Sequence, residues 1–271
     1  MLHVHNLTIS ARTRHGLRPL VKDVSFSLEA NQCLGILGES GSGKSLTCKA
    51  VMGLLGEEFD VQGEVLFQGQ NLLTLPEHKR RKLRGKEICM VIQNAMTAFN
   101  PLFSLKNQLL ETLRTHLDEP DPVLLKRILE AFEKMNLYEG ETLLLKYPHQ
   151  LSGGMLQRVM IALCIALNPV MIIADEPTTA IDVVNQVEII QELQKVRDLF
   201  HTTMIFISHD LGVLCQLCDT LMVMHEGQKV EQGSVQEVIF APKAPQTQML
   251  IQTRLELLRA FHACTEVAPC S

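Results

Sequence analysis

One glycine-rich stretch, residues 33–47, constrains the fold of this 271-residue chain more than any other feature. It opens with a short apolar run typical of a buried strand, continues with closely spaced glycines, and leads into a helix expected at 44–55. The spacing of Gly38 from Gly43, Lys44 and Ser45 matches the phosphate-binding template G-x-x-x-x-G-K-[ST], in the strand-loop-helix context that the template requires. An ordinary glycine-rich turn would leave this spacing unexplained. The sequence therefore predicts a P-loop.

The residue types of a P-loop follow from what a polyphosphate needs. Glycines let successive backbone N–H groups point inward, and the helix that follows adds a partial positive charge at its N-terminus. Lys44 is expected to hold the β- and γ-phosphates of ATP, and the Ser45 hydroxyl to ligate Mg²⁺. A P-loop alone does not separate kinases, GTPases and transport ATPases. The predicted ATP contacts are Gly38, Glu39, Ser40, Gly41, Ser42, Gly43, Lys44, Ser45 and Leu46.

A second predicted element of the site follows the apolar strand expected at residues 170–174. Asp175 and Glu176 come directly after it, and the carboxyl ends of buried strands are where open α/β sheets bind ligands. Asp175 is typical of a Mg²⁺-holding aspartate, and Glu176 of a general base that polarises the attacking water. A solvated strand end is the alternative, and the P-loop upstream weakens it. His209 follows another expected strand, 203–207, and by itself indicates only a packed or exposed histidine.

Charge and hydropathy exclude several classes of protein. The net charge of −5 argues against a nucleic-acid partner. No apolar run approaches the ~20 residues that span a bilayer, and the N-terminus lacks the features of a signal peptide. We therefore expect a cytosolic location and reduced cysteines. Cys215 and Cys218 could begin a metal site, but no second pair matches them, so burial of both on one helix face is the favoured interpretation.

The remaining segments complete an α/β fold. Alternating strands at 2–9 and 21–28 flank a polar turn at 12–19 that carries His15, and a basic helix at 75–86 is expected to present a solvated face. We predict a P-loop (RecA-like) core with a mixed sheet, an antiparallel β subdomain and an all-helical insertion. The predicted parts are the N-terminal core with the β subdomain (1–93), the helical subdomain (94–152), the rest of the core (153–225), and a C-terminal hairpin with a helical tail (226–271).

The order of these motifs resembles one family. The P-loop, Gln93, the LSGGM stretch at 151–155, the Asp175-Glu176 pair, the TAID stretch at 179–182 and His209 follow one another as in the ATP-binding cassette (ABC) ATPases. The resemblance implies a head-to-tail pair of cassettes with two ATPs between them. The P-loop of one cassette then faces the signature residues of the other, which are Ser152, Gly153 and Gly154.

The resemblance also implies a role for single residues. Gln93 senses the γ-phosphate, contributes to the Mg²⁺ site and links to the helical insertion, while Glu176 is the general base and His209 contacts the γ-phosphate. Asp182 contacts the opposite subunit. Three positions depart from the family pattern. Met155 stands where Gln is commonest, and Ile181 replaces the usual Leu. His15 stands where an aromatic residue usually stacks on adenine, so base affinity is expected to be lower.

Three stretches, at residues 98–101, 147–148 and 155–158, resemble the peptide and nickel importers, and they resemble the nickel or metallophore importers most closely. This resemblance implies an ATPase subunit that couples ATP hydrolysis to uptake of nickel or a related metal complex. A dipeptide or oligopeptide importer and a non-transport ABC ATPase are the alternatives. The implied partners are a second, different ATPase subunit, two transmembrane permeases and an extracytoplasmic solute-binding protein. The subunit would lie peripherally on the cytoplasmic face of the membrane, held wholly by permease contacts at the helical insertion.

Overall fold

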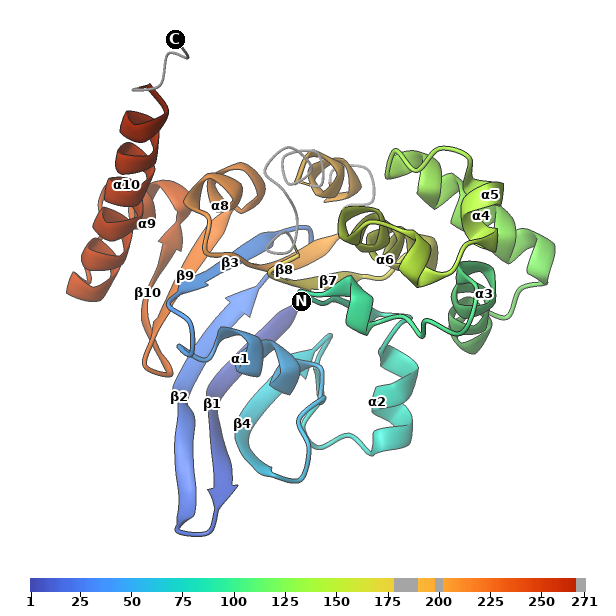
Figure 1. The fold of residues 1–271 in the computed structure, drawn as a ribbon. Helices are drawn as coiled ribbons and strands as arrows, with labels where there is room; N and C mark the ends of the chain where they lie inside the picture. The colour runs from blue at the N-terminus through green and yellow to red at the C-terminus, as the bar shows by residue number, and fades with distance from the viewer. Residues whose placement is uncertain (178–189, 198–201, 267–271) are drawn as a thin grey trace.

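Two sheets organise the computed structural model, which describes residues 1–177, 190–197 and 202–266 (Figure 1). The predicted stretch 179–182 lies outside the described residues, and the helix expected at 183–199 lies largely outside them. The larger sheet has six strands in the order β10-β9-β3-β8-β7-β6. Its strands are β3 (Cys33–Gly38), β6 (Ile88–Val91), β7 (Met171–Asp175), β8 (Thr203–Ile207), β9 (Thr220–His225) and β10 (Gln228–Ser234).

The central strands of the large sheet are parallel and buried on both faces. β3 pairs in parallel with β8 and β9, β7 pairs in parallel with β6 and β8, and only β10 is antiparallel. Side chains alternate between two hydrophobic clusters, so Cys33 and Leu37 of β3 face one cluster while Leu34 and Ile36 face the other. Burial on both faces explains why these strands read as continuous apolar runs.

The smaller sheet is antiparallel and contains β1 (Leu2–Thr13), β2 (Gly16–Leu28), β4 (Phe59–Phe67) and β5 (Gln70–Asn71), in the order β2-β1-β4-β5. The polar turn predicted at 12–19 is shorter than expected. β1 and β2 stay paired as far as Thr13 and Gly16, because pairing satisfies the backbone even where the side chains are polar, and Gly16 takes a φ of 111° at the turn.

Helices cover both faces of the large sheet. α1 (Lys44–Val51) follows the P-loop and ends earlier than the predicted residue 55, because Gly53 has a φ of 60° and breaks the helix. The basic helix is also shorter than predicted, because Pro76 precedes its first residue and Arg84 is extended. The other helices are α2 (Glu77–Leu83), α8 (Leu211–Leu217), α9 (Val235–Phe240) and α10 (Pro245–Glu266), with short 3₁₀ turns at Ala95–Thr97 and Pro148–Gln150.

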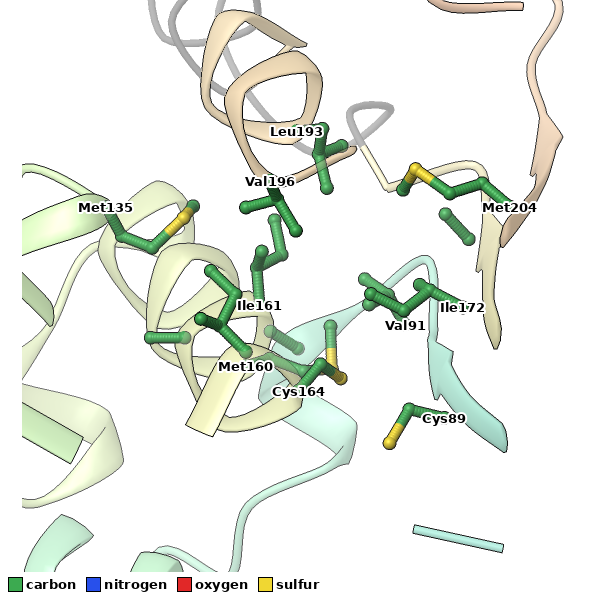
Figure 2. Close-up of a cluster of buried hydrophobic side chains, with 14 of the residues drawn as sticks. Cys89, Val91, Met135, Met160, Ile161, Cys164, Ile172, Leu193, Val196 and Met204 are labelled. Atoms are coloured by element: carbon green, nitrogen blue, oxygen red, sulfur yellow. The ribbon is translucent and has the colours of Figure 1, made fainter. Parts of the chain in front are cut away.

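A helical layer stands at one end of the large sheet (Figure 1). It consists of α3 (Leu105–His116), α4 (Asp121–Lys134) and α5 (Gly140–Leu145), which come between β6 and α6 (Gly153–Leu167) in the chain. Figure 2 shows Met160, Ile161 and Cys164 of α6 among side chains of the sheet and of helical residues 190–197. All three α6 side chains are buried, so α6 packs the helical layer against the core.

The predicted fold class is confirmed: the structure has a P-loop core with a mixed sheet, an antiparallel β subdomain and a helical insertion. The prediction for the C-x-x-C pair is wrong in part. Cys218 follows the end of α8 and is buried, with its Sγ 3.6 Å from the Sγ of Cys33, whereas Cys215 lies within α8 on its exposed side, next to the exposed Gln216. Within the described ranges, no helix has the length and apolar character that crossing a membrane requires.

Candidate functional site

The P-loop lies between β3 and α1, and Lys44 is anchored inside it. The Nζ of Lys44 donates hydrogen bonds to the carbonyl oxygens of Gly38 at 2.9 Å and Glu39 at 2.8 Å. Burial lowers the pKa of the Lys44 amine, although the nearby carboxylates of Glu176 and Asp175 act in the opposite direction. A buried cation that is tied only to carbonyls is a strong candidate for pairing with a ligand anion.

The loop has a shape that only small residues permit. A Cβ on Gly38 would lie 2.3 Å from the carbonyl oxygen of Met224 and 2.6 Å from the Oγ of Ser42. Gly43 takes a φ of 100° where α1 begins. The buried Ser42 hydroxyl has no hydrogen-bond partner within the described part of the chain. A buried hydroxyl without a partner, beside the amides of a helix N-terminus, fits a bound phosphate.

Two of the three predicted metal ligands, Ser45 and Asp175, meet across the sheet edge. The Oγ of Ser45 donates to the Oδ1 of Asp175 at 2.8 Å. Burial raises the pKa of the Asp175 carboxyl, which the hydrogen bond from Ser45 partly offsets. A hydroxyl and a carboxylate at this spacing are hard oxygen donors, so their chemistry fits Mg²⁺.

Glu176 stands at the centre of a second cluster. Its Oε2 lies 3.4 Å from the Nε2 of Gln93 and 3.7 Å from the Nδ1 of His209. Its backbone N–H donates to the carbonyl oxygen of Ile207, and its φ is 46°, a region that non-glycine residues rarely adopt. The constrained backbone directs this carboxylate toward residues that follow two other strands.

Strand register explains why these distant residues meet. Val91 pairs with Ala174, and Asp175 pairs with Ile207, so β6, β7 and β8 end at the same edge. β3 lies beside β8 in the sheet although β6 and β7 come between them in the chain, which brings the P-loop to the same edge. Ligands of open α/β sheets bind at such a reversal of strand order.

Two groups of predicted residues lie apart from this edge. Ser152 caps α6 by accepting a hydrogen bond from the N–H of Met155 at 3.2 Å, and Ser152 and Gly153 are exposed. Within the described residues, no hydrogen bond joins the signature residues to the P-loop. His15 lies exposed in the turn between β1 and β2. The fold of one chain therefore leaves both groups open to solvent.

Gln157 is a residue whose importance the sequence alone did not reveal. It is 2% exposed on α6, and its Nε2 donates to the carbonyl oxygen of Ile92 at 3.2 Å. Ile92 directly precedes Gln93, so this bond connects the helix that begins at the signature residues to the Glu176 cluster. The available signal was a polar pair, Gln157 and Arg158, on a helix that is otherwise apolar.

A P-loop with a cationic anchor, two oxygen donors for a metal and a glutamate held between Gln93 and His209 defines a nucleotide hydrolase. Residues 21–179 match the ABC transporter family. The chain belongs to that family, and it is an ATP-hydrolysing transporter ATPase that binds ATP.

Three known proteins illustrate the similarity. The metal-staphylopine import system ATP-binding protein CntD of Staphylococcus aureus (strain Mu50) is 41% identical over 95% of this chain and 94% of its own length. The oligopeptide transport ATP-binding protein OppD of Escherichia coli K12 is 40% identical over 90% of this chain and 73% of its own. A dimeric post-hydrolysis structure of the ATP-binding cassette MJ0796 with ADP and Pi has a TM-score of 0.77 at 26% identity, and covers 87% of this chain and 99% of that one.

Proposed function

We propose that this chain is the ATPase subunit of an importer and that Glu176 is the general base for ATP hydrolysis. The observation that carries the proposal is the position of the Glu176 carboxylate, between the amide of Gln93 and the imidazole of His209 at the sheet edge that also holds Lys44. A carboxylate there can orient and deprotonate an attacking water, while His209 contacts the γ-phosphate.

Lys44 and the loop amides would hold the phosphates of ATP, with Ser42 giving its free hydroxyl to one of them. Ser45, Asp175 and the amide oxygen of Gln93 would hold Mg²⁺, which supplies charge neutralisation at the β- and γ-phosphates when bound. Burial of Asp175 strengthens its interaction with a divalent cation, because few water molecules compete.

A single chain provides half of each ATP site in this proposal. The exposed Ser152-Gly153-Gly154 stretch would contact ATP held by the P-loop of a second cassette. The similarity to a dimeric cassette structure supports this arrangement. The second cassette would be a different ATPase subunit, and ATP-driven closure with reopening on hydrolysis would move the attached permeases.

An apolar groove between the core and the helical layer is the proposed permease contact. It has a volume of about 290 Å³, and its lining includes Met90 and Ile92 of the core, Phe99, and Met160 and Leu163 of α6. Docking of two membrane-spanning permeases there would place the subunit at the cytoplasmic face of the membrane. An extracytoplasmic binding protein would complete the importer.

For the cargo we propose nickel, another divalent metal or a metal–chelator complex. The support is the relative named for metal-staphylopine import, which aligns over 94% of its own length, whereas the OppD relative aligns over 73% of its own. Oligopeptide or dipeptide import is the second candidate, since OppD is nearly as similar in sequence.

Cellular uptake of radiolabelled nickel tests the assignment. Cells that express the wild-type chain should accumulate nickel, cells without the gene should not, and excess dipeptide should leave uptake unchanged. Glu176→Gln serves as the control, because it removes the proposed base without removing the protein. Unchanged nickel uptake together with lost dipeptide uptake would move the cargo to peptides and keep the ATPase mechanism.

A further inference from the structure

A basic cavity lies beside the proposed permease groove and takes no part in ATP hydrolysis. It has a volume of about 620 Å³ and lies between α2 and the C-terminal end of α3. Its lining has no apolar side chain and consists of Arg81, Lys82, Arg84, Gly85, Lys86, Thr115 and His116. The chain as a whole carries a net charge of −5, so this concentration of cations is local.

The cavity has a fixed frame. Arg84 donates to both carboxylate oxygens of Glu77 at 2.9 and 3.0 Å, and to the carbonyl oxygens of Met52 and Gly53. The ring of His116 lies directly against Gly85: a Cβ at this position would be only 2.3 Å from the Nε2 of His116. Gly85 has a φ of 81°, which only glycine adopts easily. The charge of Arg84 is thus neutralised, and the residue holds the wall in place.

Three other cations in the lining carry uncompensated charge. Within the described ranges, Arg81, Lys82 and Lys86 make no side-chain hydrogen bond or ion pair with the protein, and all three are exposed. Three unpaired cations around a concave surface, with the imidazole of His116 as a further polar group, match the charge and hydrogen-bonding needs of a phosphate group.

The position of the cavity indicates where such a phosphate would come from. The cavity and the apolar groove share Gly85 in their walls. If the groove docks a permease, as the proposed function has it, the basic cavity lies close to the membrane surface, where anionic lipids attract clustered lysine and arginine.

We propose that this cavity binds a phosphate group, and that the phosphate belongs to the headgroup of an anionic membrane lipid. The subunit would then be held at the membrane by lipid as well as by the permeases. This differs from attachment through permease contacts alone, which the family resemblance implies.

The test uses the purified full chain, without permeases, and two probes. One probe is vesicles of phosphatidylcholine with or without phosphatidylglycerol, and the other is free glycerol phosphate. Lys82→Gln/Lys86→Gln should weaken binding to phosphatidylglycerol vesicles about thirtyfold, the expected effect of removing two lysines from an anionic surface. The control Lys126→Gln/Lys195→Gln removes two exposed lysines elsewhere and should bind like the wild type.

Each outcome of the binding experiment supports or contradicts the lipid proposal. Binding to the vesicles alone supports a lipid headgroup, while equal dependence on Lys82 and Lys86 for free glycerol phosphate supports a phosphate site with a soluble ligand. The proposal is wrong if the wild type binds neither probe, or if both double variants bind equally.

Two further readouts separate lipid binding from a stabilising role of Lys82 and from an effect on ATP hydrolysis. Lys82 lies in the last turn of α2, where a cation also stabilises the helix, and that role alone predicts lower thermal stability with unchanged vesicle binding. ATP hydrolysis by the purified variant should equal that of the wild type. Failure of the lipid proposal therefore leaves the proposed ATPase function intact.

Discussion

The ATP-binding edge of the sheet and the signature end of α6 differ in how complete they are within one chain. At the edge, Lys44, the Ser45–Asp175 pair and the Glu176 cluster already make their hydrogen bonds and close contacts. At the signature end, Ser152 bonds only within its own helix and faces solvent. A parallel sheet can preorganise half of a composite site, whereas the other half depends on a second chain.

The largest expected effect comes from the complete half. Glu176→Gln should slow ATP hydrolysis ~10²-fold or more, because it removes a general base, while ATP binding stays intact since the amide keeps the size of the side chain. Steady-state phosphate release and equilibrium nucleotide titration measure the two quantities. Turnover near that of the wild type would refute the role of Glu176.

A substitution at the signature end of α6 should lower ATP hydrolysis by the assembled transporter without changing ATP binding by the isolated chain. Gly153→Asp should leave the nucleotide affinity of the isolated chain unchanged, because no hydrogen bond among the described residues joins Gly153 to the P-loop of its own chain. In the assembled transporter, ATPase activity should fall roughly 100-fold, as when an electrostatic contact to the transition state is lost. Lys44→Ala is the matched contrast and should weaken nucleotide binding by the isolated chain. Weaker binding in both variants would contradict the division into two halves.

The hydrogen bond from Gln157 to the carbonyl oxygen of Ile92 connects the two halves and can be removed by itself. Gln157→Leu leaves the carbonyl of Ile92 without its donor and should lower the unfolding free energy by about 1–3 kcal/mol. Because Gln93 follows Ile92, ATPase activity should also fall about fivefold, equivalent to roughly 1 kcal/mol of barrier. Denaturant titration and an ATPase assay measure both, and Gln191→Leu, at an exposed position, is the control. A stability loss with full activity would restrict Gln157 to a structural role.

The smallest effect concerns stability without ligands. Burial raises the pKa of Asp175, so the folded state binds more protons than the unfolded state, and stability falls as the pH rises through the folded pKa. Asp175→Asn carries no charge and should unfold at a higher temperature than the wild type at about pH 8, when nucleotide and Mg²⁺ are absent. The difference should shrink as the pH falls toward 3.8, the ordinary aspartate value.

The same variant should gain little stability from added ATP and Mg²⁺, in contrast to the wild type, because it lacks the carboxylate for the metal. Thermal scans at several pH values with and without ligand measure both effects. A variant that is less stable than the wild type at every pH would contradict this prediction. It would show that the Asp175 carboxylate stabilises the fold even without a metal.

Errors in the sequence-based prediction concern elements whose ends depend on contacts. The turn around His15 was predicted too long because polar residues there pair with a neighbouring strand. Cys215 was predicted buried from helical spacing, but within α8 it lies on the exposed side, while Leu211, Leu214 and Leu217 are buried. The roles of the site residues and the domain boundaries stay predictions.

The sequence by itself determined the P-loop, the acidic pair after β7 and the fold class, because these depend on local strand, loop and helix patterns that short-range interactions specify. Only the tertiary structure decided which side chains meet. Gln93 and Glu176 are 83 residues apart in the chain, and the register of three parallel strands brings them together. The bond from Gln157 to Ile92 and the basic cavity likewise arise from packing between helices and sheet, which residue spacing does not encode.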